Sequence, residues 1–201
     1  MAYSNFTLDT VCREFQLDVV EASGIFSTTQ SVVPRERFLA ELDEKIQLAI
    51  SIGTEKARSE LIVTDVLFEL REQFNRQISF FSGVEFNVDE DKGLNGVCDF
   101  LVSKSPILSF LEAPIIIIVE AKKDNLTLGF GQCAAEMYAA QQFNVKKENE
   151  IPCIYGATTS GTDWRFLKLD GKHIHIDRSL YAIGQYEKIL GILTNMVQQK
   201  V

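Results

Sequence analysis

The sequence predicts an α/β (α+β) fold in which a central mixed β-sheet is flanked by helices. The strongest indication is the run 114–123, where the five β-branched residues 115–119 are followed directly by charged side chains. An apolar run without alternation is typical of a central strand that is covered on both faces. Strands with alternating patterns and a turn rich in glycine precede this run, and amphipathic helices lie on either side of it in the sequence.

The composition indicates one globular domain of 201 residues, because 46% of the residues are hydrophobic and 24% are charged. No apolar run approaches the roughly 20 residues of a membrane span, and the first nine residues lack the features of a signal peptide. We therefore expect a cytoplasmic protein with no membrane partner. The net charge of −8 argues against non-specific coating of nucleic acid. The widely spaced cysteines are expected to be free thiols: Cys12, Cys98, Cys133 and Cys153.

We expect a single domain, 1–201, with three parts. Residues 1–53 are predicted to form an N-terminal helical extension, 54–176 the core, and 177–201 a C-terminal region dominated by an amphipathic helix from 181 to 199. The predicted core elements are a helix over 54–77, strands over 78–88, 97–102 and 115–119, a helix from 127 or 129 to 143, a strand over 151–158 and a hairpin over 164–176.

Two carboxylates occupy positions in the core where a carboxylate is costly. Glu60 continues the apolar face of the helix predicted over 54–77, and Asp99 interrupts an otherwise apolar strand. A buried acid costs several kcal/mol unless it has a partner or a metal ion. The alternatives are structural: Glu60 can lie in an exposed first turn and favour the helix dipole, and Asp99 can bond to backbone amides.

More polar residues follow at the end of the central strand. Glu120 and Lys122 are two residues apart, so they point to the same face of an extended chain. Gln132 falls in the first turn of the next helix, near the end of that strand, although it is also compatible with an ordinary solvated position. His173 and His175 share a strand face, but no third ligand lies nearby, which favours surface histidines over a zinc site.

Together these side chains indicate metal-dependent phosphodiester hydrolysis. The carboxylates of Asp99, Glu120 and Glu60 offer the oxygen ligands that Mg²⁺ or Mn²⁺ prefers. Lys122 beside the ion can hold or deprotonate an attacking water. We expect these groups to converge on one pocket beside a basic groove that offsets phosphate repulsion. The candidate basic residues are Lys56, Arg58, Lys122, Lys123, Lys146 and Lys147.

The order of these residues resembles the PD-(D/E)XK nuclease superfamily, which includes restriction endonucleases, archaeal Holliday-junction resolvases and RecB-type nucleases. The likeness covers about residues 54–176, through Glu60 on a helix, Asp99 on a hairpin strand, Glu120-Ala121-Lys122 and then Gln132. The whole chain also resembles an uncharacterised bacterial family with the blocks 54–60 and 119–122.

The resemblance implies a restriction-endonuclease-like fold, a Mg²⁺ or Mn²⁺ cofactor, nucleic acid (DNA above all) as the substrate, and a homodimer, as in many such nucleases. It also implies that Asp99 and Glu120 bind the metal and that Lys122 serves the attacking water. Glu60 would assist the metal or its waters, and Gln132 would support the site.

The sequence departs from the superfamily pattern at two positions. Cys98 stands where a proline precedes the acid, and Glu136 stands where the RecB-type branch has a tyrosine, with Tyr138 two residues later. These departures leave the branch and the substrate open. Two other interpretations also stay open: a PD-(D/E)XK-like scaffold that has lost catalysis and binds a protein partner, and a buried structural cluster of ionised side chains.

Overall fold

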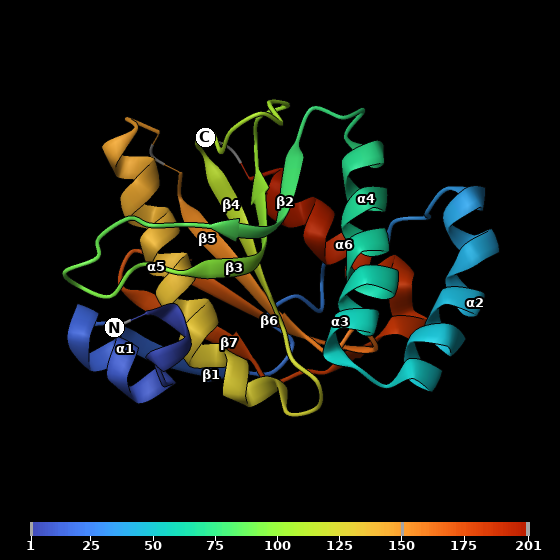
Figure 1. Ribbon diagram of the computed structural model, residues 1–201, viewed down its shortest axis with the longest axis horizontal. Helices are drawn as coiled ribbons and strands as arrows, with labels where there is room; N and C mark the ends of the chain where they lie inside the picture. The colour runs from blue at the N-terminus through green and yellow to red at the C-terminus, as the bar shows by residue number, and fades with distance from the viewer. Residues whose placement is uncertain (1, 150, 200–201) are drawn as a thin grey trace.

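A computed structural model of the chain, which describes residues 2–149 and 151–199, contains a mixed eight-stranded β-sheet between helices (Figure 1). The order is β1-β7-β6-β5-β4-β3-β2, and β8 pairs with β6. β1–β7 and β4–β5 are parallel, and the other pairs are antiparallel. This confirms the predicted fold class. The strands are β1 Asp18–Ala22, β2 Ser79–Glu85, β3 Val97–Ser103, β4 Ile115–Ala121, β5 Cys153–Thr159, β6 Asp163–Asp170, β7 His173–Asp177 and β8 Tyr181–Ala182.

Helices cover both faces of the sheet. One apolar cluster joins the sheet to α1 and α5, and the other joins it to α2, α4 and α6. None of the helices in the described part of the chain has the length and hydropathy needed to cross a bilayer. The α-helices are α1 Leu8–Phe15, α2 Glu36–Ile52, α3 Glu55–Arg58, α4 Thr64–Gln73, α5 Phe130–Lys146 and α6 Tyr186–Val197. The 3₁₀ turns are η1 Tyr3–Asn5, η3 Leu126–Gly129 and η4 Ile183–Gln185.

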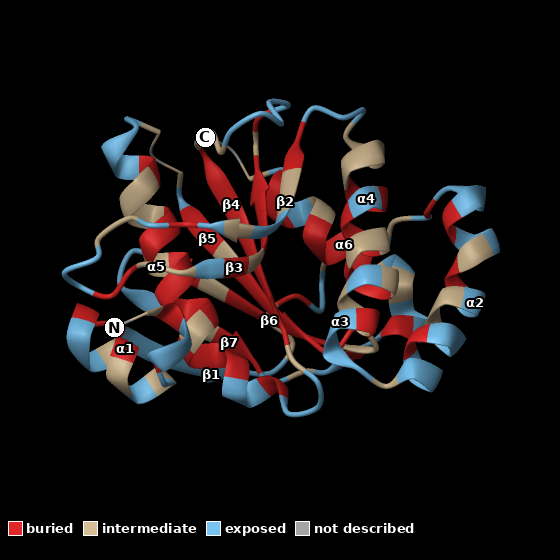
Figure 2. Ribbon diagram, viewed as in Figure 1, coloured by how far each residue is buried: buried red, intermediate tan, exposed pale blue. Residues whose placement is uncertain are grey.

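The central strand β4 is buried along its whole length, as its apolar sequence predicts (Figure 2). Ile117 and Val119 contribute to the cluster under α4 and α6, whereas Ile118 contributes to the cluster under α5. Because side chains alternate along a strand, the next residue, Glu120, points to the α5 side. The sequence therefore places a carboxylate at the end of a strand that is otherwise apolar on both faces.

The helix predicted over 54–77 is divided by a π-helical segment, η2 Ser59–Val63, between α3 and α4. A π turn contains more residues than the 3.6 of an α-helix, so each residue advances by a smaller angle. Val63, Leu67 and Leu70 are buried as predicted, but Glu60 is exposed and does not continue their face. The expected register of Glu60 is therefore wrong, and the wider turn is the physical reason.

Two strands differ from the sequence prediction. β1 lies within the segment 1–53 that was predicted to be helical, and all five of its residues are exposed. It forms an edge of the sheet beside β7, so part of the N-terminal segment belongs to the sheet. Tyr181 and Ala182 form β8 on β6 instead of starting the C-terminal helix, which begins at Tyr186. All four cysteines are free, as expected.

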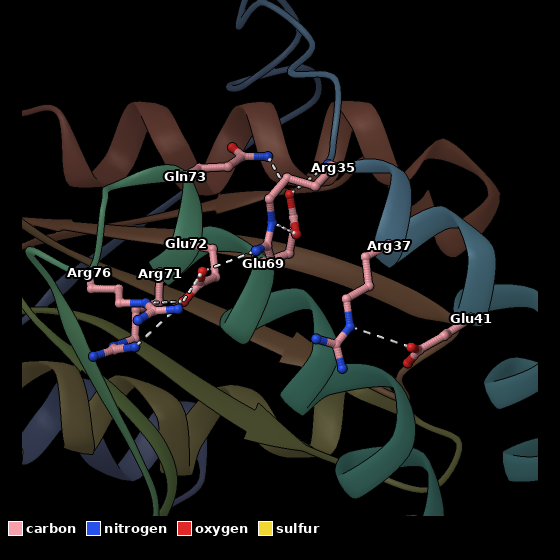
Figure 3. A network of polar contacts seen from close by, with 8 residues as sticks. All are labelled: Arg35, Arg37, Glu41, Glu69, Arg71, Glu72, Gln73 and Arg76. Carbon is pink, nitrogen blue, oxygen red and sulfur yellow. Dashed lines mark hydrogen bonds and ion pairs between the residues drawn. The ribbon is translucent and has the colours of Figure 1, made fainter.

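A network of arginines and glutamates joins the start of α2 to α4 (Figure 3). Glu69 is fully buried and accepts hydrogen bonds from the backbone N and Nε of Arg35, both at 2.9 Å, and from Nε2 of Gln73 at 3.1 Å. Glu72 accepts from Nη1 of Arg35 at 3.0 Å and from Nε of Arg76 at 2.7 Å. Since three donors meet the buried carboxylate of Glu69, the network ties α2 to the core instead of destabilising it.

Asp177 at the end of β7 anchors the loop that leads from β1 to α2. Its fully buried carboxylate accepts from the backbone N of Gly24 and of Ser179, both at 2.9 Å, from Phe26 N at 3.3 Å and from the Tyr181 hydroxyl at 3.0 Å. Burial raises the pKa of Asp177, but hydrogen bonds from Ser179, Gly24 and Tyr181 outweigh it and lower the pKa overall. The ionised form of Asp177 is therefore the form that the fold stabilises.

We expect Asp177→Ala to lower the free energy of unfolding by roughly 3 kcal/mol, because it leaves several buried donors without an acceptor. A lowered pKa in the folded state gives stability that is present above the ordinary value of about 3.8 and is lost as the pH falls through the folded value. Thermal unfolding followed by circular dichroism between acidic and neutral pH measures both effects. Asp91→Ala, in an exposed turn, is the control. Equal melting temperatures for the two variants would contradict this role of Asp177.

Candidate functional site

Asp99 and Glu120 lie beside each other on neighbouring antiparallel strands. Phe100 on β3 is paired with Val119 on β4, which brings the preceding residue, Asp99, next to the end of β4. Oδ2 of Asp99 accepts a hydrogen bond from the backbone N of Ala121 at 2.8 Å. The structure therefore brings these two predicted site residues together at the end of β4.

Glu120 is 1% exposed, and its Oε1 accepts a hydrogen bond from Nζ of Lys122. Its Oε2 is buried and has no hydrogen-bond partner among the described residues. Burial and the nearby charge of Asp99 raise the pKa of Glu120 to about 8, although Lys122 acts in the opposite direction. Burial lowers the pKa of Lys122, but Glu120, Asp99 and Glu55 outweigh it and raise the pKa overall. Lys122 is therefore an ammonium ion held between carboxylates.

Gln132 joins Lys122 to a fully buried acid, Glu136. Oε1 of Gln132 lies 3.4 Å from Nζ of Lys122, and its Nε2 donates to Oε1 of Glu136 at 3.1 Å. Oε2 of Glu136 has no partner among the described residues. Burial and the charge of Glu120 raise the pKa of Glu136 well above its usual range, which favours the neutral form of this side chain. Because Glu136 anchors the amide nitrogen, the amide oxygen of Gln132 points toward Lys122.

The turn η3 covers the Glu120–Lys122 pair at Gly129. A Cβ atom on Gly129 would lie 3.1 Å from Cγ2 of Thr158, 3.2 Å from Cγ of Lys122 and 3.4 Å from Cγ of Glu120. Thr158 is paired with Glu120 in the β4–β5 register, and its hydroxyl is also buried without a partner. A glycine at this position therefore lets the turn approach a pocket of polar atoms that lack partners.

Glu60 lies at the rim of the site, not within it. It lines a cavity of about 210 Å³ together with Asp99, Lys56 and Glu55. The side chain of Glu60 is 61% exposed and forms an ion pair with Lys56 at 3.0 Å. Glu120 and Lys122 do not line this cavity, which Ala121 separates from them. Of the five predicted residues, Glu120, Lys122 and Gln132 are thus joined by side-chain contacts, Asp99 is tied to them through the backbone of Ala121, and Glu60 lines the same cavity as Asp99.

Two acids near the site were not predicted from the sequence. Glu55 lines the same cavity as Asp99, and its charge raises the pKa of both Glu120 and Lys122. Glu55 follows Thr54, whose side chain caps α3. A helix N-cap followed by an acid is the sequence feature that could have placed Glu55 at this helix end. Glu136 was noted only as a departure from a tyrosine pattern. An acid within an alanine-rich helix that packs on a sheet was the signal for its burial.

The expected basic groove is only partly present. Lys56 lines the cavity beside Asp99. Nη1 of Arg58 donates to the carbonyl of Lys123 at 3.1 Å, so Arg58 and Lys123 also lie next to the site. Lys146 and Lys147 are wrong for this role, because they lie at the other end of α5, about 24 Å along the helix from its first residue. Nζ of Lys146 instead bonds to the carbonyl of Val88 at 2.9 Å.

No group of three or more His, Cys, Asp or Glu side chains in residues 2–149 and 151–199 is arranged to hold a metal ion. In the site, Glu60 is turned toward Lys56 and Glu120 toward Lys122. His173 lies 3.9 Å from Asp18 on the exposed edge of the sheet, in agreement with a surface position. The oxygens nearest to each other that could receive a cation include those of Asp99 and Glu55 and Oε2 of Glu120.

No protein-family model matches this chain, and no curated protein sequence is significantly similar to it.

We expect Glu136→Gln to stabilise the protein at pH 8 by more than about 1 kcal/mol and to change its stability little at pH 4. An acid with a raised pKa stays protonated in the folded state while the unfolded state loses its proton above about pH 4.5, so stability falls as the pH rises. Glutamine keeps an oxygen acceptor for Gln132 and has no such proton. Urea unfolding at both pH values measures the difference. A pH-independent effect would contradict a neutral Glu136.

Proposed function

We propose that this protein is a metal-dependent nuclease that hydrolyses phosphodiester bonds by a PD-(D/E)XK-type mechanism. The observation that carries the proposal is that Asp99, Glu120 and Lys122 meet at the end of β4, where Oε2 of Glu120 is buried and has no hydrogen-bond partner among the described residues. Burial and the nearby charge of Asp99 raise the pKa of Glu120, and a bound cation would offset both effects. A purely structural cluster does not need such an arrangement.

The available oxygens suit Mg²⁺ or Mn²⁺. Both ions are hard cations that take carboxylate oxygens and keep several waters, so two protein carboxylates suffice when waters and substrate phosphate complete the shell. Asp99 and Glu120 would hold the ion, and Glu55 or Glu60 would act through its waters. When bound, the ion supplies the positive charge that polarises a phosphoryl oxygen.

The protein side chains supply the rest of the chemistry. Lys122 is an ammonium ion with a raised pKa, so it donates hydrogen bonds from Nζ to orient a water or a non-bridging phosphate oxygen. Gln132 directs its amide oxygen toward Nζ and limits the directions in which Lys122 can turn. The turn at Gly129 packs against the side chains of Glu120 and Lys122 and shields the Glu120 carboxyl group from solvent.

Nucleic acid, with DNA as the expected substrate, is the proposed partner. Lys56, Arg58 and Lys123 lie beside the site and offset part of the repulsion between phosphates and an acidic protein. A homodimer and a cytoplasmic location are part of the same proposal.

A non-catalytic scaffold is the second candidate function. It is favoured by the fact that Asp99, Glu120 and Glu60 each have a partner within the chain, namely Ala121 N, Lys122 and Lys56. In that case the site is self-neutralised and the protein acts by binding another protein.

We expect the purified protein to bind Mn²⁺ in the sub-millimolar to millimolar range, measured by isothermal titration calorimetry, and to cleave DNA in a reaction that a chelator stops. Asp99→Asn and Glu120→Gln should abolish both metal binding and cleavage. Lys122→Met should lower the cleavage rate roughly 10²–10⁴-fold while metal affinity stays the same or rises, because a positive charge beside the ion is removed.

Lys147→Met is the matched control, since it removes a lysine at the far end of α5 that is not paired with Glu120. Circular dichroism establishes that each variant is folded. A wild-type protein that binds no divalent ion and cleaves neither single-stranded nor double-stranded, linear nor branched DNA or RNA would favour the scaffold. Loss of stability without change in metal binding would instead indicate a structural cluster.

Glu55 and Glu60 make a second comparison. We expect Glu55→Gln to weaken Mn²⁺ binding about tenfold, since Glu55 interacts electrostatically with both Glu120 and Lys122. Glu60→Gln should have a smaller effect, because its exposed carboxylate is paired with Lys56. Calorimetric titration of both variants decides the order. The reverse order would mean that Glu60 leaves Lys56 to reach the metal.

A further inference from the structure

A cavity of about 560 Å³ lies on the sheet face opposite to Glu120, within the size range of small-molecule sites. Its floor includes Tyr155 on β5 and Lys168 on β6, which are directly opposite in the strand register and share that face. Tyr155 packs against the cluster under α4 and α6, whereas Glu120 points to the α5 side. The cavity is therefore separate from the proposed nuclease site.

The walls of this cavity are held in place by specific contacts. One wall is the loop between β1 and α2, and the other is α6. Nζ of Lys188 on α6 donates to the carbonyl of Ser27 at 2.9 Å and to that of Thr29, and Val32 N donates to the carbonyl of Glu187 at 2.9 Å. Together with the Asp177 anchor at Gly24 and Phe26, these bonds form the cavity before any ligand arrives.

The charge of the lining indicates an anionic ligand. Among the described residues that line the cavity, Lys168 alone is charged, although the chain as a whole carries a net charge of −8. The ion pair of Lys168 with Asp170 at 3.0 Å is partly exposed, so a ligand anion can compete for the ammonium group. The neutral polar groups around it are the side chains of Thr28, Thr29, Ser31, Asn195 and Gln198. Thr194 also lines the cavity, but its Oγ1 is buried beneath the cavity surface and makes no contact with a ligand there.

One further feature indicates the shape of the ligand. The ring of Tyr155 is half-buried and held by Phe26, with ring centroids 6.3 Å apart in an edge-to-face arrangement. The open side of the Tyr155 ring is then a surface for stacking a planar ring.

We propose that this cavity binds a small phosphorylated ring compound of mononucleotide size. Its phosphate contacts Lys168, its ring stacks on Tyr155, and its hydroxyl groups bond to the neutral side chains of the loop and of α6. This site does not depend on the nuclease proposal, because it uses none of the same residues and lies on the other face of the sheet.

The test is calorimetric titration of the full-length protein with AMP, adenosine and inorganic phosphate. We expect AMP to bind with a dissociation constant on the order of 10–1000 µM and more tightly than adenosine or phosphate. Lys168→Gln should weaken AMP binding at least about tenfold. Lys92→Gln is the matched control, because Lys92 is also paired with an aspartate at 3.0 Å but lies in the β2–β3 turn, and it should leave AMP binding unchanged.

Asn195→Ala separates ligand binding from folding. Asn195 lines the cavity and is exposed, so its truncation should preserve the melting temperature while it weakens AMP binding. Tyr155→Leu should weaken AMP binding and leave phosphate binding intact. If AMP does not bind at millimolar concentration, or binds Lys168→Gln and Asn195→Ala as it binds the wild type, the proposal is wrong.

Discussion

The arrangement of the site follows from the burial of Glu120 at the end of the central strand. The five preceding residues of β4 are fully buried on both faces, so the strand delivers the carboxylate into a region from which water is excluded. A charge in that position is unfavourable without compensation. Lys122 supplies one partner, but Asp99 adds a second negative charge beside it, and the balance leaves Glu120 with a pKa of about 8.

The surrounding elements are adapted to this charge. β3 approaches β4 closely enough for Asp99 to bond to Ala121 N, and the turn η3 packs a glycine against Glu120 and Lys122. α5 contributes Gln132 and the buried acid Glu136, which extend the polar contacts into the apolar cluster below. Such a network has polar atoms without partners at both ends, as in sites that complete their bonding only with an ion or a substrate.

The other face of the sheet is organised by a different buried carboxylate. Asp177 is satisfied by four donors and needs no ion, so its role is to hold the β1–α2 loop against the sheet. That loop and α6 then enclose the cavity above Tyr155 and Lys168. Asp177 is a buried acid whose bonds support the fold. Glu120 is a buried acid with one oxygen, Oε2, that has no hydrogen-bond partner among the described residues.

The sequence by itself determined the features that depend on local pattern. The unbroken apolar run predicted β4, and residue alternation predicted that Glu120 and Lys122 share a face. Tertiary structure decided the features that depend on non-local contacts or on backbone detail. The π turn moved Glu60 off the apolar face, and pairing with β7 made a strand of the exposed residues of β1. The position of Glu55 and the burial of Glu136 depend on which elements pack together at the end of β4. The local spacing of apolar residues in the sequence does not specify that packing.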